Sequence, residues 1–424
     1  MAFWDWTQWE REIDIMAMNG VNLALAVVGQ EGVWQNVLRR FGYSDMEILK
    51  FLPEPAYQAW WLMGNLEGTG GPVSQEYINT RIELQKKILT RFNELGIEPV
   101  LQGFYGMVPA NFKKKIVDAD VKEQGEWFGH TRPAILVGDF IDTVANVWYE
   151  ETEKLFGQWT YFGGDPFHEG GSTAGIDVSA TASKLQNAMI KANPEAVWLL
   201  QAWQSNPKDA LLQGLKKDQT MVLDYSNDII GQWKNRNSFN GHPWIYGVIN
   251  NFGGNVGLYG RLQKVASDVY TMRNSSNKGK NWGIGIAPEG IIYNSISYDL
   301  MWDLAWDTAR INIDNWIENY AANRYGVELQ NTKNAWKILS QTAYNCSRYQ
   351  EGTTESVING RPSKKLERVS CCSTTELYYK ATDLIPAWDN MIHTSDVLRD
   401  KSTFQYDIVA VSYTHLRAHE TVLD

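Results

Sequence analysis

Short apolar runs alternate with longer amphipathic segments along most of the chain, and this rhythm limits the folds open to it more than any other feature. Segments with helical periodicity, such as YINTRIELQKKILTRFNELG and VSATASKLQNAMIKANPEA, separate the apolar runs. Repeated strand and helix units of this kind predict an α/β fold with a parallel sheet or barrel. The expected strands are VNLALAVV, IEPVLQGFYG, TYFGGDPF, AVWLLQAW, TMVLDYS, PWIYGVIN and NWGIGIAPE.

Polar residues stand at or just after the ends of these strands. In a (β/α)₈ barrel the active site lies at the carboxyl ends of the strands, so this placement favours a TIM-type barrel. Seven strands are one too few, and the chain opens with a helical pattern from Trp6 to Ala17. We therefore expect the first strand to lie before Met1. The polar residues are Gln30, Glu31, Asp165, His168, Glu169, Gln201, Asp224, Asn250, Asn251 and Glu289.

The strand pattern stops after about Ile296, and helical patterns follow it. This change predicts a C-terminal α-helical domain. We expect a barrel over residues 1–295 that lacks its first strand, and an incomplete helical domain over 296–410. The final residues 411–424, VSYTHLRAHETVLD, do not continue the pattern. They are either a non-native tail or an ordinary polar terminus.

Composition excludes several classes of function. A formal net charge of −10 argues against non-specific binding to nucleic acid, and we expect the run Lys113 to Lys115 to be a solvated loop. No apolar stretch is long enough to cross a membrane, and the N-terminus lacks the pattern of a signal peptide. The cysteines Cys346, Cys371 and Cys372 lack metal-site spacing, although Cys346 could pair with either of the others. We expect no metal and no cofactor.

Two glutamates carry the chemical hypothesis. Glu169 in GGDPFHEGG and Glu289 in GIAPEGIIYN each follow a strand and are flanked by glycines that leave space for a ligand. They are 120 residues apart (289 − 169), a few strand and helix units in a barrel of about 250 residues. Glycoside hydrolysis needs such a pair, one to donate a proton and one to attack the anomeric carbon or activate water. The alternative is that both are ordinary acidic residues in turns.

Several long motifs, in order, resemble the α-N-acetylglucosaminidases of glycoside hydrolase family 89. The likeness extends from the start to about Cys346 and more loosely to about Asn390. It implies a retaining exo-hydrolase with a (β/α)₈ barrel and a helical C-terminal domain, with Glu169 as the general acid/base and Glu289 as the nucleophile. The motifs are WDWTQWEREIDIMAMNGVNLALAVVGQEGVW, WWLMGNLEG, LGIEPVLQGFYGMVP, EAVWLLQAW, NNFGGN and GIAPEG.

The resemblance also implies that Glu12, Trp60 and Trp203 line the sugar pocket. In relatives the acid/base often follows asparagine, whereas here it follows His168. That histidine could raise or lower the pKa of Glu169, depending on its own charge. Position at strand ends or in these motifs adds further candidates for substrate binding, namely Gln30, Glu31, Asn65, His168, Asp224, Asn250 and Asn251.

The hypothesis is therefore hydrolysis of terminal α-linked N-acetylglucosamine from heparan-type or mucin-type glycans. In that sugar the 2-acetamido group lies on the same face as the leaving group, so it cannot attack from behind, and a protein nucleophile is needed. Two alternatives stay open: an inactive or sugar-binding fragment of such a barrel, and an exo-glycosidase of another specificity. The resemblance implies an extracellular, periplasmic or lysosomal location. The sequence leaves the oligomeric state open, a homo-oligomer included.

Overall fold

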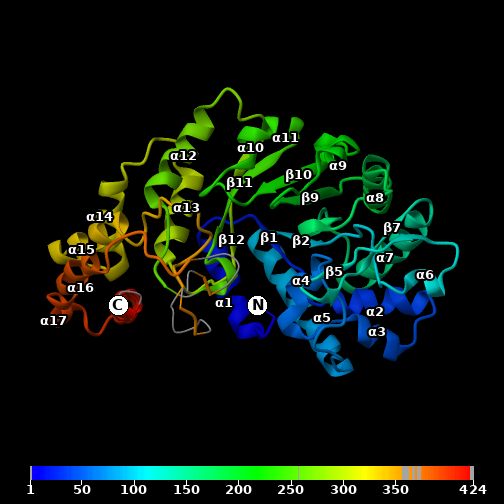
Figure 1. The fold of residues 1–424 in the computed structure, drawn as a ribbon, viewed down its shortest axis with the longest axis horizontal. Helices are drawn as coiled ribbons and strands as arrows, with labels where there is room; N and C mark the ends of the chain where they lie inside the picture. The colour runs from blue at the N-terminus through cyan, green and yellow to red at the C-terminus, as the bar shows by residue number, and fades with distance from the viewer. Residues whose placement is uncertain (1, 256, 356–361, 365–367, 370–373, 421–424) are drawn as a thin grey trace. The chain divides into compact units, whose positions relative to one another are not determined.

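The chain forms two compact units in this computed structural model. Unit 1 comprises Met1–Leu223 and Arg236–Trp244, and unit 2 comprises Asp224–Asn235 and Ile245–Asp424. Figure 1 shows their helices and strands. The structure describes residues 2–255, 257–355, 362–364, 368–369 and 374–420.

Unit 1 is built on a parallel sheet. Its strands lie in the order β1, β2, β8, β9, β10, and each neighbouring pair from β1 to β9 is parallel. All seven strands expected from the sequence are present in the chain, and five of them are in this unit. Apolar runs rich in β-branched residues and leucine are typical of parallel strands that are buried on both faces. The five are β1 (Leu23–Leu25), β2 (Glu98–Gln102), β8 (Tyr161–Gly163), β9 (Val197–Ala202) and β10 (Thr220–Asp224).

Helices follow the strands of this sheet, and α2, α5, α7 and α8 line one side of it in Figure 1. The longest, α5, starts at the cap residue Ser74, whose hydroxyl accepts from the amide of Tyr77 at 3.0 Å, and ends at Gly96 with a left-handed φ of 70°. The helices of unit 1 are α1 (Trp6–Met18), α2 (Gln30–Arg40), α3 (Asp45–Phe51), η1 (Pro55–Tyr57), α4 (Gln58–Leu62), α5 (Gln75–Leu95), α6 (Phe112–Lys115), α7 (Phe140–Phe156), η2 (His168–Gly170), α8 (Val178–Ala192), α9 (Asp209–Gln213), η3 (Lys217–Gln219) and α11 (Asn237–Asn240).

A long excursion between β2 and α7 adds small antiparallel elements that the sequence rhythm did not predict. One sheet has the order β3, β7, β4, and a separate hairpin pairs β5 with β6. Strands of two to four residues are too short to show a period of two, so sequence pattern alone does not find them. The strands are β3 (Met107–Val108), β4 (Asp120–Lys122), β5 (Glu126–Trp127), β6 (His130–Thr131) and β7 (Ala134–Val137).

Tryptophans fill the core of unit 1. Trp34 is fully buried, with its ring centroid 4.7 Å from that of Trp148 and 6.3 Å from that of Trp61. Phe51 packs edge-on against Trp34 at 5.2 Å. Aromatic pairs at these distances add stability beyond the area they bury. Much of the tryptophan content therefore serves packing.

Unit 2 contains the strands β11 (Trp244–Asn250) and β12 (Asn281–Pro288), which are neighbours in their sheet. Helices dominate the rest, and within the described residues no strand follows β12, as the sequence predicts. The helices are α10 (Gln232–Asn235), η4 (Phe252–Gly254), α12 (Leu262–Asn274), α13 (Ser295–Trp306), α14 (Ile313–Tyr325), α15 (Gln330–Gln341), η6 (Ala381–Leu384), α16 (Ile385–Ile392), α17 (Ser395–Leu398) and α18 (Ser402–Glu420).

A buried ion pair joins two of these helices. Arg324 on α14 donates to Asp407 on α18 at 2.7 Å, and the hydroxyl of Tyr325 donates to the same carboxylate at 2.8 Å. Both charged side chains are at least 85% buried, so each compensates for the lost hydration of the other. Helix α18 continues through residue 420 and so covers most of the segment that the sequence left as a possible tail.

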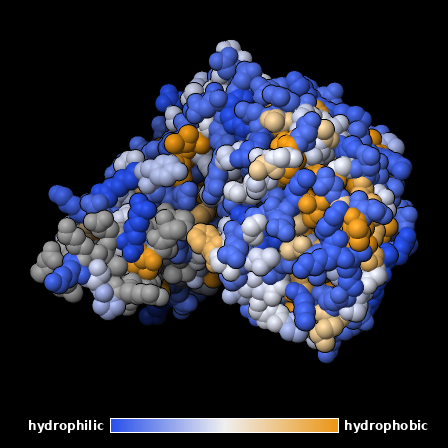
Figure 2. Space-filling view, turned by 45° about the vertical axis from the view of Figure 1, so that its right-hand side comes forward, coloured by the Kyte–Doolittle hydropathy of each residue, from blue (hydrophilic) through white to orange (hydrophobic). Residues whose placement is uncertain are grey.

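The surface is mostly hydrophilic, with separate apolar patches on the face shown in Figure 2. Among the described helices, none combines the length and apolar character needed to span a membrane. Cys346 is a buried free thiol. The pairing of Cys346 that the sequence left open is therefore not formed, and its possible partners Cys371 and Cys372 lie outside the described residues.

A buried carboxyl group ties β8 to β9 at their carboxyl ends. Asp165 is 2% exposed, and it accepts from the main-chain amide of Gln201 at 2.8 Å and from its side-chain amide at 2.9 Å. Burial raises the pKa of Asp165 to about 7, although both hydrogen bonds oppose that rise. The folded chain therefore holds a proton here that the unfolded chain releases near pH 4.

This proton makes stability depend on pH. The Asp165 carboxyl stabilises the fold fully below its unfolded pKa, and the contribution is lost as pH rises towards about 7. We expect Asp165→Asn to melt at nearly the wild-type temperature at pH 4.5 and several degrees higher than wild type at pH 7.5, since one pKa unit between the two states corresponds to about 1.4 kcal/mol. The exposed Asp118→Asn is the matched control. The same difference in melting temperature between wild type and Asp165→Asn at both pH values would contradict a raised pKa for Asp165.

Candidate active site

Glu169 lies in the turn after β8, where the backbone is unusual. Its φ is 42°, and Phe167 and Gly170 on either side of His168 and Glu169 also have positive φ, at 64° and 85°. A left-handed backbone is uncommon for residues with a side chain and persists only where neighbours hold it in place. The turn therefore needs external supports.

Arg132, from the segment after β6, supplies the main support. Its guanidinium donates to the carbonyl oxygen of His168 at 3.0 Å and to that of Glu169 at 2.6 Å. It also donates to the side-chain oxygen of Asn65 at 3.4 Å, which turns the amide nitrogen of Asn65 towards Glu169. Burial lowers the pKa of Arg132, while the charge of Glu169 works in the opposite direction.

Two neutral donors fix the carboxyl group of Glu169 itself. The Asn65 side chain donates to one oxygen, and the indole of Trp203 donates to the other at 3.0 Å. Each carboxyl oxygen keeps a second lone pair, so a proton can still enter or leave. The structure thus brings together three residues that the sequence placed in the site, Glu169, Asn65 and Trp203.

His168 does not bring a charge to its neighbour. Its ring is buried, and the amide of Asn206 lies 3.4 Å from its Nδ1. Burial and then the charge of Arg132 lower the pKa of His168 to about 4. Between about pH 5 and 8 the imidazole is therefore neutral, and its role here is packing and hydrogen bonding.

Glu289 follows β12 directly and is exposed at the strand end in unit 2. Its main-chain amide donates to the carbonyl of Asn250 at 3.0 Å, and its carboxylate accepts from the amide of Gly253 at 2.5 Å. Gly253 has a φ of 69°, which a residue without a side chain adopts at no cost. A main-chain amide therefore fixes the carboxylate at the end of its strand.

The turn after Glu289 is clamped by a chain of buried amides. The Asn251 side chain donates to the carbonyl oxygens of Gly290 and, at 2.9 Å, Tyr293. Asn294 donates to Asn251 at 2.5 Å and accepts from the hydroxyl of Tyr344 at 3.1 Å. Asn251 was a candidate for substrate binding. The structure uses its amide to position the turn that carries Glu289.

The other strand-end candidates of unit 2 are buried. Asp224 accepts from the main-chain amide of Trp233 at 3.0 Å. Asn250 is 7% exposed, and among the described residues its amide nitrogen has no hydrogen-bond partner. A buried donor in this state costs free energy, so it is available to a water molecule or a ligand group.

Gln30 and Glu31 begin α2 in unit 1 and are almost completely buried. Glu31 accepts from Gln58 at 2.6 Å and from the hydroxyl of Tyr77 at 3.4 Å, and burial raises its pKa to about 7. Both amide atoms of Gln30 lack a partner within the described part of the chain. These residues form a buried polar group next to the strand end, and in the described part of the chain no hydrogen bond joins them to Glu169.

Trp60 is 39% exposed on α4 and belongs to an aromatic surface group, with ring centroids 6.4 Å from Tyr57 and 6.2 Å from Trp127. Such a surface suits the C–H face of a sugar. Glu12 lies on α1, which packs against α5, and burial raises its pKa. Among the described residues, no hydrogen bond or ion pair joins Glu12 to the other candidates.

Sequence reasoning missed Arg132 and Gly253. Arg132 lies 37 residues before Glu169 in a stretch without a motif, and Gly253 acts through its main chain. Only the glycine pair in NNFGGN signalled a special backbone. Each of the two units thus holds a glutamate in a fixed place with neutral or main-chain donors, an arrangement suited to a group that gains or loses charge during a reaction.

Comparisons with known proteins agree with this chemistry. The family model for the α-N-acetylglucosaminidase TIM-barrel domain matches residues 1–308, and that for the C-terminal domain of the same enzymes matches 316–422. The α-N-acetylglucosaminidase of Homo sapiens is 33% identical over 96% of this chain and 56% of the human protein. The chain thus spans about half the length of its relatives.

Solved structures give the same result. A family 89 glycoside hydrolase from Clostridium perfringens, in complex with 2-acetamido-1,2-dideoxynojirmycin, is 39% identical with a TM-score of 0.94, over 98% of this chain and 48% of that one. Another structure of the Clostridium enzyme, 38% identical with a TM-score of 0.94 and the same coverage, carries two glutamate-to-glutamine changes and holds its substrate GlcNAc-α-1,4-galactose. A family 138 enzyme that targets pectin, 12% identical with a TM-score of 0.58, shares the fold alone.

The resemblance seen in the motifs is therefore confirmed. A family model matching well over half of the chain, a relative above 30% identity along nearly all of it and a near-identical fold agree. This chain belongs to the α-N-acetylglucosaminidases of glycoside hydrolase family 89.

Proposed function

We propose that this chain carries the catalytic centre of a retaining exo-glycosidase that removes terminal α-linked N-acetylglucosamine from glycans. The observation that carries the proposal is the pair of strand-end glutamates, each fixed by neutral or main-chain donors. The Clostridium relative was solved with its substrate after two of its glutamates were changed to glutamine, which supports a two-glutamate centre. We also infer an eight-stranded (β/α)₈ barrel, as the family model's name implies.

The proposed mechanism assigns a different role to each glutamate. Glu289 attacks the anomeric carbon, the bond to the leaving oxygen breaks, and Glu169 gives that oxygen a proton. Glu169 then takes a proton from water, which hydrolyses the ester on Glu289. A retaining pair requires the two carboxyl groups to lie roughly 5 to 5.5 Å apart in the working enzyme.

The substrate is inferred from the acetamido sugars bound to the relatives. Heparan-type and mucin-type glycans both offer a terminal α-linked N-acetylglucosamine, and the family's extracytoplasmic or lysosomal setting fits either. The aromatic surface around Trp60 is suited to the sugar beyond the scissile bond.

Release of an aryl group from an α-N-acetylglucosaminide tests the function. We expect hydrolysis of this substrate and little from the β-anomer or from the α-glucoside, because neither offers both the α-linkage and the acetamido group. Binding of the sugar without hydrolysis would favour a sugar-binding fragment instead. Preferential cleavage of the α-glucoside would favour another specificity.

Azide rescue separates the roles of the two glutamates. Glu289→Ala removes the nucleophile, so hydrolysis should fall by several orders of magnitude for any leaving group. Glu169→Ala should retain the first step with a dinitrophenyl leaving group, which needs no proton. Added azide should give the α-glycosyl azide from Glu169→Ala and the β-azide from Glu289→Ala. The exposed Glu195→Ala is the control, with wild-type activity. Opposite anomers would reverse the two roles.

Trp203 provides a subtler test because its indole donates to Glu169 at 3.0 Å. Trp203→Phe removes that donor and keeps most of the ring, so the acid/base should lose its alignment. We expect kcat/KM to fall roughly tenfold or more for a sugar leaving group and much less for a dinitrophenyl one. Trp282→Phe, at a tryptophan that is 56% exposed, should change neither value. Equal losses for both leaving groups would show that Trp203 acts on the sugar instead.

A further inference from the structure

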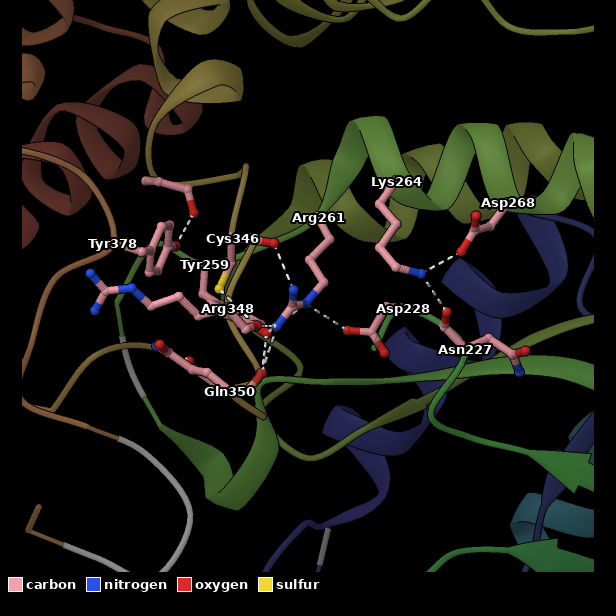
Figure 3. A network of polar contacts seen from close by, with 12 residues as sticks. Asn227, Asp228, Tyr259, Arg261, Lys264, Asp268, Cys346, Arg348, Gln350 and Tyr378 are labelled. Carbon is pink, nitrogen blue, oxygen red and sulfur yellow. Dashed lines mark hydrogen bonds and ion pairs between the residues drawn. The ribbon is translucent and has the colours of Figure 1, made fainter. Parts of the chain in front are cut away.

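An arginine in unit 2 ties the segment after α15 to the strand region that carries Glu289. The Arg261 guanidinium donates to the carbonyl oxygens of Cys346 and Arg348, both at 2.6 Å, and of Gln350 at 2.9 Å. Figure 3 shows these bonds converging on one side chain, with Asp228 at 3.8 Å on its other side. Three carbonyls bound by one planar group fix the course of residues 346–350, here called the strap.

The strap is braced from a second side. The hydroxyl of Tyr259 donates to the carbonyl of Gln350 at 2.7 Å and accepts from Arg261 at 3.1 Å. Burial opposes charge on Arg261, yet Tyr259, Cys346 and Asp228 together raise its pKa. The guanidinium therefore stays charged at every pH at which the protein is folded, and the strap is held throughout.

The next two residues bring the strap to the loop that binds Glu289. A Cβ on Gly352 would lie 3.4 Å from the carbonyl oxygen of Phe252, so the two backbones are in contact there. The residue after Phe252 is Gly253, whose amide donates to the Glu289 carboxylate. Glu351 thus stands between the anchored strap and the loop that holds the nucleophile.

The charge of Glu289 also affects the pKa of Glu351. Half-burial first, and the negative charge of Glu289 second, raise the pKa of Glu351. Two further charged groups lie beside the strap. Glu351 helps to raise the pKa of Asp228, and Asp228 lies 3.8 Å from the guanidinium of Arg261. Glu289 is the charged group that raises the pKa of Glu351 itself.

We propose that Glu351 is a positioning residue for the reaction, a second carboxylate that the Arg261-bound strap holds beside the nucleophile Glu289. The proposal rests on the proposed function. The negative charge of Glu351 affects the reaction in two ways. It destabilises the free Glu289 carboxylate more than the neutral ester formed on it, and it stabilises positive charge developing on the sugar ring in both steps.

The experiment compares Glu351→Gln with wild type, using the pH profile of kcat/KM for an aryl α-N-acetylglucosaminide. Two interacting carboxyl groups lose their protons in two steps. The acidic limb of the wild-type profile reports the second step, in which Glu289 and Glu351 both become charged. In Glu351→Gln, Glu289 ionises without a second negative charge beside it. We expect the limb to move to lower pH by roughly 0.5 to 1 unit and the plateau to fall roughly tenfold.

Two further variants act as controls. Glu351→Asp keeps the charge, so it should restore much of the plateau and leave the limb near its wild-type position. Glu376→Gln makes the same change at an exposed glutamate of the same region, paired with Arg348 at 3.0 Å, and should match wild type. Thermal melting of Glu351→Gln should not fall below that of wild type, because glutamine fills the same volume and removes a carboxyl group whose pKa is raised.

A measurement that does not depend on activity tests whether Glu351 and Glu289 interact, even if the chain hydrolyses no substrate. With [5-¹³C]glutamate labelling, the Glu289 carboxyl signal, assigned by its loss in Glu289→Gln, should titrate in two steps in wild type and in one step in Glu351→Gln. An inactive wild type with this titration pattern would refute the proposed function and keep the pairing of the carboxyl groups. An unchanged limb or an unchanged Glu289 titration would overturn the inference, whatever happens to the plateau.

Discussion

Main-chain carbonyl oxygens in irregular turns need hydrogen-bond donors, and side chains that meet this need hold the turn of Glu169 in unit 1 and the turn of Glu289 in unit 2. Arg132 binds the carbonyls of His168 and Glu169, and Asn251 binds those of Gly290 and Tyr293. Glu169 and Glu289 are not part of the strands themselves. They lie one or more residues beyond the strand, where the regular ladder has ended and the carbonyls would otherwise be unsatisfied. The donors therefore decide where each carboxylate sits.

The chemistry of the donors explains why these residue types occur. An amide can donate twice and accept through its oxygen, so Asn251 joins two carbonyls to Asn294. A guanidinium spans a longer gap, and in Arg132 and Arg261 it reaches two or three carbonyls from one side chain. Holding that charge in a partly buried place has a cost, which lowers the pKa of Arg132. Arg261 avoids the same outcome because Tyr259, Cys346 and Asp228 surround it.

Much of the fold could be predicted from the sequence because its signals are local. The seven strands and the helices between them follow from runs of apolar residues and their period, and each expected strand is present. Glu169 and Glu289 were identifiable because a carboxylate between glycines at a strand end is unusual. The small antiparallel strands between β2 and α7 escaped because two to four residues carry no period.

The rest of the site was hidden because its contacts join residues far apart in sequence. Arg132 reaches Glu169 across 37 residues, and Arg261 reaches Gln350 across 89. Position at a strand end also did not reveal what a polar group does. Asn251 and Asn65 occupy comparable positions after ordered elements, yet the first binds main-chain carbonyls and the second binds the Glu169 carboxylate. That difference depends on which neighbours have unsatisfied groups, and only the folded arrangement shows it.

The division of the chain into two compact units places Glu289 together with the C-terminal helices. Unit 2 contains Glu289 and β12 together with the helices from α13 to α18, so Glu289 shares its packing with the C-terminal helices. The turn after Glu289 reaches Tyr344 through Asn251 and Asn294, and Tyr344 stacks on Trp336 of α15 at 6.2 Å. Changes in these helices can therefore alter the position of the Glu289 carboxylate, because the chain of amides transmits a displacement of Tyr344 to the turn.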